Sequence, residues 1–248
     1  MHMLQYSIRN AGECAFTVEF EEKISPEVNL SVTLLASNQK LKNARGIVET
    51  IPAYRSLTVV YNPYILSYKK LYSLLKSICD SLPTGKSNTN INSKTYIIPT
   101  CYGGEYGTDL SSVAERANLT ADEVISIHSK TKYLIYMLGF LPGFAYLGGL
   151  DERLFTPRLE SPRTSIPSGS VGIGGSQTGI YPINSPGGWN IIGRTPLKIY
   201  DPNRSNSILF SSGDYIRFLP ISFEKYIQIE EEIKLGRYEY RVEEEDIR

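Results

Sequence analysis

A stretch rich in glycine and proline in the second half of the chain constrains the fold more than any other feature. Between Gly139 and Gly193 lie 12 of the 20 glycines and 6 of the 14 prolines. Short apolar runs alternate there with these turn-forming residues, which is the pattern of many short strands joined by shaped turns. We therefore expect this part of the chain to form a β-barrel.

The N-terminal part alternates strand and helix patterns instead. A polar stretch over 83–93 interrupts it and has the composition of a linker or long loop. The expected order of elements is βαββαβ, which is that of the ferredoxin-like split motif. In chain order the expected segments are a strand at 16–20, a helix at 29–41, strands at 46–52 and 56–61, a helix at 68–81 and a strand at 94–99.

A helical hairpin is expected between this module and the glycine-rich region. Its helices cover 109–118 and 121–129. Thr120, with Glu123 three residues later, forms a capping box at the start of the second helix.

The end of the chain predicts a helix over 221–236 and an edge strand over 238–242. The expected fold class is α+β with two domains. A ferredoxin-like domain occupies 1–95, and a β-barrel domain with the helical hairpin and the C-terminal helix occupies 96–248.

Charge and the N-terminus argue against several classes of protein. Twenty-six basic and 26 acidic residues cancel, so no net positive field exists to hold nucleic acid or an anionic membrane. The N-terminus lacks the basic and apolar segments of a signal peptide, and no apolar run reaches the roughly 18 residues of a membrane span. Cys14, Cys79 and Cys101 are odd in number and widely spaced, so neither disulfides nor a zinc site is indicated. We expect a protein of the reducing cytoplasm without a metal site.

Arginine replaces lysine throughout the glycine-rich region. From Tyr133 to Leu197 there is no lysine. The guanidinium group is a planar fork that binds carboxylates or phosphates with two parallel hydrogen bonds, whereas an ordinary solvated surface mixes lysine with arginine. A site for a small carboxylate is therefore expected. The basic residues of the region are Arg153, Arg158, Arg163 and Arg194.

Two glycine clusters support the same expectation. Gly172 to Gly175 and Gly187 to Gly188 allow positive φ angles and let backbone amides approach a ligand. For any single glycine, turn geometry in a barrel is the commoner explanation.

Side chains near these clusters are candidates for ligand contact. Trp189 is the only tryptophan; it either walls a pocket or fills a core, and core filling is the commoner role. Gln177, Tyr181 and Asn190 add neutral groups that suit a lactam or satisfy buried backbone equally well.

Two reactive side chains lie near the junction. His128 ends a helix, where it is either a general acid or base or a histidine that interacts with the helix dipole. A Cys101 thiol nucleophile paired with His128 can be imagined, but a free cysteine is more often a small buried hydrophobe. The run from Gly174 to Gly179 lacks the Lys-Ser of a phosphate-binding loop and does not form a GxSxG elbow. Neither an ATP site nor serine-hydrolase chemistry is indicated.

One set of motifs extends over nearly the whole chain. The runs are 139–149 (GFLPGFAYLGG), 162–164 (PRT), 167–173 (PSGSVGI), 175–179 (GSQTG), 186–189 (PGGW) and 193–197 (GRTPL), with 52–57 (PAYRSL) and 101–105 (CYGGE) in the first half. These runs resemble the family of the B subunit of 5-oxoprolinase. That family also includes KipI, an inhibitor of a sporulation sensor kinase, and proteins labelled allophanate hydrolase first subunit.

The resemblance implies a ferredoxin-like N-terminal domain and a cyclophilin-like C-terminal barrel. It also implies assembly with two other subunits, one of KipA type and one of LamB/YcsF type, into a complex that opens 5-oxo-L-proline to L-glutamate with ATP. ATP would serve the complex and need not contact this chain, which alone would be nearly inactive. The segments that match contain or adjoin the expected site residues. His128 and Arg163 are the expected catalytic residues, and the expected substrate-binding residues are Tyr146, Arg158, Gln177, Tyr181, Trp189 and Arg194.

Other functions compete with this hypothesis. The main alternative is a KipI-like regulatory protein that docks on a sensor histidine kinase and inhibits it. Residues 110–128 loosely imitate a helix-turn-helix, but acidic residues at the start of the second helix argue against DNA binding. Another alternative is a piece of a urea carboxylase, whose carboxyl-transfer region resembles the B-type and KipA-type subunits fused. It ranks below the enzyme-subunit and kinase-inhibitor hypotheses because no biotinyl-lysine context is evident.

Overall fold

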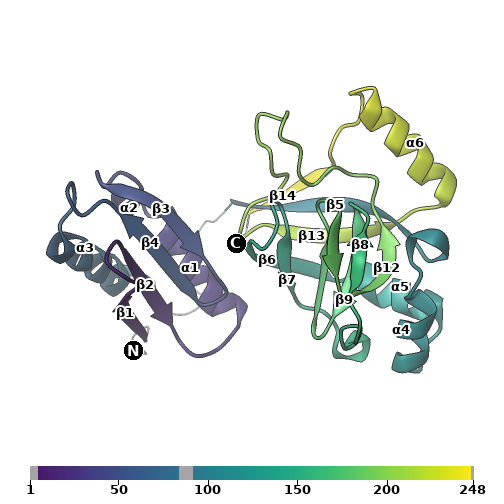
Figure 1. Ribbon diagram of the computed structural model, residues 1–248, viewed down its shortest axis with the longest axis horizontal. Coiled ribbons are helices and arrows are strands. Elements are labelled where there is room, and N and C mark those ends of the chain that lie inside the picture. The colour runs from purple at the N-terminus through teal and green to yellow at the C-terminus, as the bar shows by residue number, and fades with distance from the viewer. Residues whose placement is uncertain (1–4, 84–91, 247–248) are drawn as a thin grey trace. The chain divides into compact units, whose positions relative to one another are not determined.

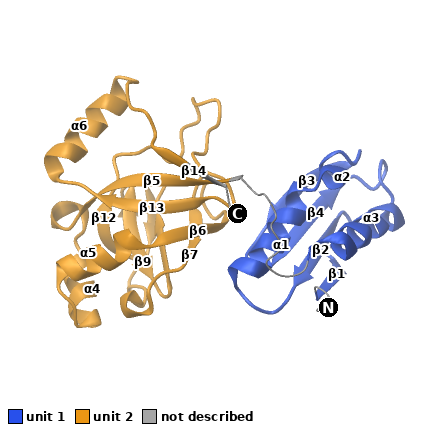
Figure 2. Cartoon of the chain, turned by 180° about the vertical axis from the view of Figure 1, so that it is seen from behind, with its two compact units in different colours: residues 1–91, 247–248 blue, residues 92–246 orange. Residues whose placement is uncertain are grey.

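The computed structural model describes residues 5–83 and 92–246 and divides the chain into two compact units. The first comprises 1–91 with 247–248, and the second comprises 92–246 (Figure 2). Each unit has its own cluster of buried apolar side chains.

The first unit is an antiparallel sheet with helices against one face. Its strands are β1 (Tyr6–Asn10), β2 (Ala15–Phe20), β3 (Ile47–Pro52) and β4 (Ser56–Tyr61), in the spatial order β1-β2-β4-β3. Burial alternates along β2 and β4, so every second side chain faces the core. The helices α1 (Pro26–Ser37), α2 (Gln39–Lys42) and α3 (Tyr68–Ser81) supply the rest of that core (Figure 1).

The expected order βαββαβ lacks the first strand, β1, and is wrong in its last strand. Residues 94–99 belong to β5 (Asn92–Tyr102), which pairs with strands of the second unit. The place beside β2 is taken by β1, because a short turn containing Gly12, at φ 75°, returns the chain antiparallel to β1. The observed order is therefore ββααββα, and the expected boundary after residue 95 falls inside β5.

The second unit is built around a long, nearly closed sheet. Its strand order is β10-β9-β12-β5-β13-β6-β7, and β14 pairs with β5 off this path. The end strands β7 and β10 lie against each other, which brings the sheet close to a barrel. These strands are β5, β6 (Lys132–Leu138), β7 (Ala145–Gly148), β9 (Ser170–Gly174), β10 (Gln177–Ile180), β12 (Asn190–Arg194), β13 (Tyr215–Pro220) and β14 (Val242–Asp246).

Shorter elements surround the barrel. A two-stranded sheet, β8 (Arg163–Ile166) with β11 (Ser185–Gly187), lies off the main path. The hairpin α4 (Leu110–Ala117) and α5 (Ala121–Lys130) matches the sequence prediction to within a residue or two at each end, and α6 (Phe223–Lys234) packs against β5. Single turns of 3₁₀-helix occur at η1 (Gly104–Tyr106) and η2 (Glu152–Leu154). No helix within 5–83 and 92–246 is long and apolar enough to cross a membrane.

The capping box predicted at the start of α5 is confirmed. The Thr120 amide donates to Glu123 Oε2 at 2.7 Å, and the Glu123 amide donates to Thr120 Oγ1 at 3.2 Å. These reciprocal bonds satisfy amides that have no partner within the helix.

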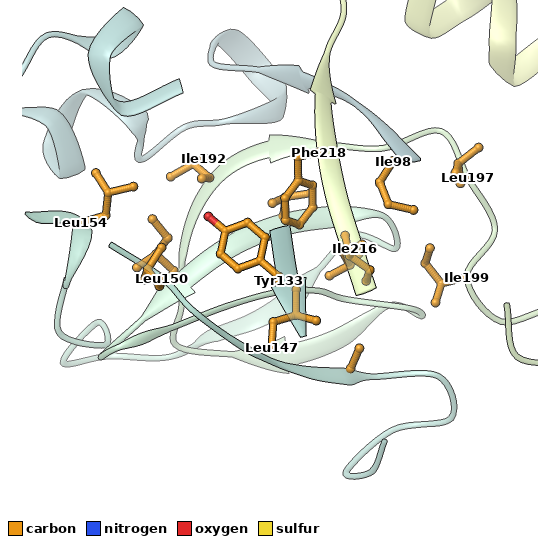
Figure 3. Packing of buried hydrophobic residues seen from close by; sticks show 14 of the residues in the cluster. Ile98, Tyr133, Leu147, Leu150, Leu154, Ile192, Leu197, Ile199, Ile216 and Phe218 are labelled. Carbon is orange, nitrogen blue, oxygen red and sulfur yellow. The ribbon is translucent and has the colours of Figure 1, made fainter. Parts of the chain in front are cut away.

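The barrel interior is filled with side chains from several strands. Tyr133, Leu147, Ile192 and Phe218 come from β6, β7, β12 and β13 and point toward one another (Figure 3). Because these residues are close-packed, the barrel is a core and not a channel. A ligand must therefore bind at the rim or the outer face.

Candidate functional site

A small cavity lies beside the loop from β6 to β7 and the segment from β11 to β12. Its volume is about 140 Å³. Pockets for drug-sized ligands usually measure about 300–1,000 Å³, so this cavity fits a ligand of few atoms and not a whole nucleotide. The lining residues are Phe140, Phe144, Tyr146, Arg158, Tyr181, Pro186, Gly187, Gly188 and Trp189.

Aromatic rings form the apolar walls of the cavity. Phe144 lies among three of them, and its ring centroid is 5.1 Å from that of Tyr146, 5.9 Å from that of Tyr181 and 5.5 Å from that of Trp189. All three contacts are edge to face, a preferred geometry of aromatic pairs. Packed rings of this kind give a preformed surface for a flat apolar group.

Three glycines make room for these rings. A β-carbon at Gly174 would lie 2.4 Å from Cδ1 and Nε1 of the Trp189 indole, and one at Gly179 would lie 3.1 Å from the same indole. A β-carbon at Gly187 would lie 2.3 Å from the Tyr181 hydroxyl oxygen. None of the three glycines has a positive φ angle. Close ring packing, not turn geometry, therefore explains why they are glycine.

Arg158 is the one charged side chain in the lining. Its segment is held on both sides: Asn190 Nδ2 donates to the Pro157 carbonyl at 2.8 Å, and the Leu159 amide donates to the Gly188 carbonyl at 2.7 Å. Arg158 is exposed and forms no ion pair with any side chain in the described parts of the chain. A guanidinium without a carboxylate partner at the edge of an apolar cavity is suited to an anionic ligand.

Tyr181 supplies a neutral hydroxyl to the same wall. Burial raises its pKa, while a hydrogen bond from the Trp189 backbone and the charges of Arg158 and Arg163 act in the opposite direction. The phenol is therefore protonated at neutral pH and does not act as a base.

The loop from β6 to β7 displays an exposed aromatic ring beside the cavity. Phe140 has φ 66°, and the Leu141 amide donates to the Gly139 carbonyl at 2.8 Å, so Phe140 is the central residue of a strained γ-turn of positive φ. Residues 141–144 then form a second turn, closed by a 3.0 Å bond, with proline and a glycine of φ 83° at its centre. The Phe140 side chain is left 71% exposed. Strain and exposure at a cavity together point to a functional role.

Arg163 lies outside the cavity lining and faces a carboxylate. Its Nη2 donates to Asp109 Oδ1 at 2.7 Å, and its Nη1 donates to the Trp189 carbonyl at 3.3 Å. The other oxygen of Asp109 accepts from the Ile191 amide at 2.6 Å. The guanidinium is thus engaged with the backbone of the cavity wall, and its predicted catalytic role has no support in this geometry.

His128 lies in the barrel core, not in the cavity. Its side chain is fully buried; Nδ1 is 2.7 Å from the Tyr102 hydroxyl and Nε2 is 2.8 Å from Thr178 Oγ1. Thr178 donates its own proton to the Gly172 carbonyl at 3.0 Å. Thr178 Oγ1 therefore accepts from Nε2–H, and Nδ1 accepts from Tyr102, which assigns the neutral tautomer from the hydrogen-bond network.

The electrostatics of His128 agree with a neutral ring. Burial lowers its pKa from 6.5 to about 3, so the imidazole stays uncharged at any physiological pH. Both nitrogens have partners inside the protein. The general acid or base predicted from the sequence therefore has no access to a ligand in this structure, and the helix-dipole alternative also does not describe its contacts.

Two further predicted residues lie away from the cavity. Gln177 begins β10 opposite Gly174. Arg194 ends β12, where its Nε donates to the Ser168 carbonyl at 2.9 Å and its guanidinium lies over the Tyr106 ring at 5.7 Å. Cys101, which pairs with Arg194 across the sheet, is buried, and that burial raises the pKa of its thiol. A buried neutral thiol matches the role of a small buried hydrophobe and not that of a nucleophile.

Four of the six predicted substrate-binding residues therefore lie together in the cavity wall. Tyr146, Arg158, Tyr181 and Trp189 line it. Sequence reasoning missed Phe140, Phe144 and Asp109: the two phenylalanines lie in a motif noted for its glycines, and Asp109 precedes a helix like an ordinary N-cap residue. No sequence signal distinguishes a phenylalanine that lines a cavity from one that fills a core, or Asp109 from an ordinary N-cap residue. The regular turn around Pro142-Gly143 nevertheless indicates where the aromatic loop would fold back.

The cavity can bind and orient, but it offers little for proton transfer. No carboxylate, imidazole, thiol or ammonium group lies among the lining residues. The described residues also contain no cluster of three or more histidine, cysteine or acidic side chains that could hold a metal ion. The arrangement suits a small flat ligand that carries one anionic group.

Comparison with known proteins identifies relatives over most of the chain. The family model "Carboxyltransferase domain, subdomain C and D" matches residues 6–210. The chain is 41% identical over 237 residues to the B subunit of 5-oxoprolinase from Bacillus subtilis (strain 168), covering 92% of this chain and 98% of that protein. It is 40% identical over 210 residues to the B subunit of 5-oxoprolinase from Escherichia coli O157:H7, covering 84% and 93% respectively.

A solved structure agrees with the fold. The crystal structure of TTHA0988 superposes with a TM-score of 0.73 at 37% identity over 84% of this chain. The chain spans only 40% of that longer protein.

Proposed function

The chain belongs to the family of the carboxyltransferase domain, subdomains C and D, and from this membership we propose that it is the B subunit of an ATP-dependent 5-oxoprolinase. In this proposal it acts with a KipA-type and a LamB/YcsF-type subunit to convert 5-oxo-L-proline to L-glutamate. The free thiols of Cys14, Cys79 and Cys101 are consistent with work in the reducing cytoplasm.

One observation carries the proposal. Identity of 41% to a protein named as the B subunit of 5-oxoprolinase extends over 92% of this chain and 98% of that relative. Because the match covers nearly all of both sequences, it extends over both units of this chain and not over one of them. The naming of that relative as one subunit of an enzyme also supports assembly into a larger complex.

The cavity supports the same proposal through its chemistry. 5-Oxoproline has a flat five-membered lactam ring and one carboxylate, so the ring would lie among Phe144, Tyr181 and Trp189 and the carboxylate would face Arg158. The aromatic walls would thus exclude water from the ring, while the guanidinium would orient the substrate.

The cavity also indicates what this chain leaves to other subunits. Its lining holds no group that could serve as nucleophile or general base. Its volume of about 140 Å³ leaves no room for a nucleotide beside a substrate. We therefore assign ATP binding and the hydrolytic step to residues of the other subunits, and substrate orientation to this chain.

The proposal is tested by ATP-dependent release of glutamate from 5-oxoproline. The chain is purified together with its two partner subunits, and each component is omitted in turn. We expect activity to disappear when this chain is omitted. Full activity without it would overturn the proposal and leave inhibition of a sensor histidine kinase as the hypothesis to pursue.

A pair of variants tests the role of the cavity in the same assay. Arg158→Gln removes the unpaired guanidinium of the lining, and we expect the KM for 5-oxoproline to rise about tenfold or more, because a charge-assisted bond contributes about 1.5–3 kcal/mol. Arg153→Gln is the matched control: Arg153 pairs with Asp151 at 2.7 Å and does not line the cavity. An equal KM for both variants would contradict the carboxylate assignment.

A further inference from the structure

Asp109 and Arg163 connect three elements at the back of the cavity wall. Asp109 precedes α4, and Arg163 begins β8. Their side chains meet at 2.7 Å, although the residues are 54 positions apart in the sequence. Neither residue lines the cavity, yet both contact the segment that contains Trp189.

The backbone on each side of the indole is held by this pair. Arg163 Nη1 donates to the Trp189 carbonyl at 3.3 Å, and Asp109 Oδ2 accepts from the Ile191 amide at 2.6 Å. The Asp109 amide in turn donates to the Ile191 carbonyl at 2.8 Å, so Asp109 bonds to both backbone groups of that residue. These bonds fix the place from which the Trp189 ring projects.

The same segment determines where Arg158 lies. Asn190, between the two anchored residues, donates through Nδ2 to the Pro157 carbonyl at 2.8 Å. Gly188 accepts from the Leu159 amide at 2.7 Å. A shift of the strand would therefore move both the aromatic wall and the backbone that carries the unpaired guanidinium.

The energetics favour a geometric role for the pair. The Arg163 side chain is 34% exposed and that of Asp109 is 14% exposed. Partly exposed ion pairs contribute little net stability, because desolvation and side-chain ordering offset the attraction. Directional hydrogen bonds from a carboxylate and a guanidinium nevertheless restrict the atoms that they join.

We propose that Asp109 and Arg163 are positioning residues of the cavity. Together they set the Trp189 ring against Phe144 and Tyr181, and through Asn190 they place the Arg158 segment at its edge. This role replaces the catalytic role that the sequence predicts for Arg163. The positioning role rests on the proposed function only where 5-oxoproline is taken as the ligand.

The single tryptophan allows a direct test on the intact chain. Because Trp189 is the only tryptophan, its fluorescence reports on the cavity wall alone. We expect Asp109→Asn and Arg163→Gln to shift its emission to longer wavelength, to increase quenching by acrylamide and to raise the Kd for 5-oxoproline about tenfold. Arg163→Lys keeps the charge and one donor and should recover part of each effect.

The controls break a comparable ion pair elsewhere in the same unit. Asp151→Asn and Arg153→Gln disrupt a pair with the same 2.7 Å separation that does not reach the Trp189 segment. These variants should leave emission, quenching and Kd at the values of the unmodified chain. Far-UV circular dichroism verifies that each variant is folded. If Arg163→Gln does not fold, the emission, quenching and Kd of Arg163→Lys test the positioning role of Arg163 instead.

Each outcome bears on one hypothesis. Unchanged emission, quenching and Kd in folded Asp109→Asn and Arg163→Gln would overturn the positioning role. Absence of 5-oxoproline binding by the unmodified chain would refute the cavity assignment in the proposed function. In that case emission and quenching still decide whether the pair positions Trp189.

Discussion

At the scale of single residues, His128 illustrates how chemical identity alone misleads. A histidine beside a glycine-rich region suggests acid-base chemistry, because its ordinary pKa lies near neutrality. Here the ring bridges Tyr102 and Thr178 inside the barrel. Burial depends on which strands surround α5, and no local pattern around residue 128 contains that information.

The buried imidazole makes stability depend on pH. The pKa of His128 is lowered from 6.5 to about 3, so between these values the unfolded chain binds a proton that the folded chain does not. The free energy of unfolding therefore decreases as pH falls from about 6.5 toward about 3, by up to about 1.4 kcal/mol per pH unit from this residue. Urea denaturation at a series of pH values from 7 to 4.5 measures this slope.

His128→Gln provides the comparison, because an amide can accept from Tyr102 and donate to Thr178. We expect this variant to be less stable at pH 7 by about 1–3 kcal/mol and to lack the histidine contribution to the slope. Assembled with its partner subunits, folded His128→Gln should keep its kcat within about threefold. A kcat loss of a hundredfold or more in the folded variant would restore the catalytic hypothesis.

At the scale of elements, local patterns predicted most helices, but they missed β1 and did not show which sheet β5 joins. The helix expected over 68–81 matches α3 (Tyr68–Ser81), and the capping box begins α5 as expected. The strand expected over 94–99 forms, but inside β5 it pairs with β13 and β14. Strand formation follows from local composition, whereas strand partners are chosen by contacts between distant segments.

The same limit applies to the glycine-rich region. Its composition correctly indicates many short strands, but the reason for individual glycines appears only in three dimensions. Gly174 and Gly187 leave space for Trp189 and for Tyr181, which are 15 and 6 positions away in the chain. The first unit has the observed order ββααββα, so a ferredoxin-like relationship of that unit stays a prediction.

A substitution in the strained turn from β6 to β7 should change ligand binding while leaving the free energy of unfolding nearly unchanged. Phe140 adopts φ 66° and its ring is 71% exposed, so Phe140→Gly removes backbone strain and little buried surface. We expect the free energy of unfolding to change by less than about 1 kcal/mol, because relief of strain offsets the added chain entropy. The Kd for 5-oxoproline should rise about tenfold, because the cavity loses one aromatic wall.

Phe155→Gly is the matched control for this turn. Phe155 is also exposed but has φ −60°, and it does not line the cavity. This substitution relieves no strain, so it should reduce the free energy of unfolding and leave the Kd unchanged. If Phe140→Gly instead behaves like the control in both denaturation and ligand titration, Phe140 has no part in binding.

At the scale of the whole molecule, the chain consists of two units with separate cores. The buried cluster of the first unit uses residues between Phe16 and Cys79, and that of the second uses residues between Ile98 and Ile229. All residues of the cavity belong to the second unit. The sequence predicted two domains, but it assigned the first part of β5 to the wrong one, because a polar stretch before a strand does not reveal which sheet the strand will join.

The position of that boundary decides which truncated chain should fold. Residues 92–95 pair with 243–246 of β14, and Thr95 also pairs with Tyr215 of β13. A chain of residues 92–248 therefore keeps every strand contact of the barrel, and we expect it to unfold cooperatively and to bind 5-oxoproline with the Kd of the intact chain. A chain of residues 96–248 leaves β14 without most of its partner strand and should melt at a temperature lower by several degrees. Calorimetry and Trp189 fluorescence titration of the two chains compare them directly. Equal melting temperatures would place the boundary where the sequence predicted it, and loss of folding in both would mean that the barrel depends on the first unit for its stability.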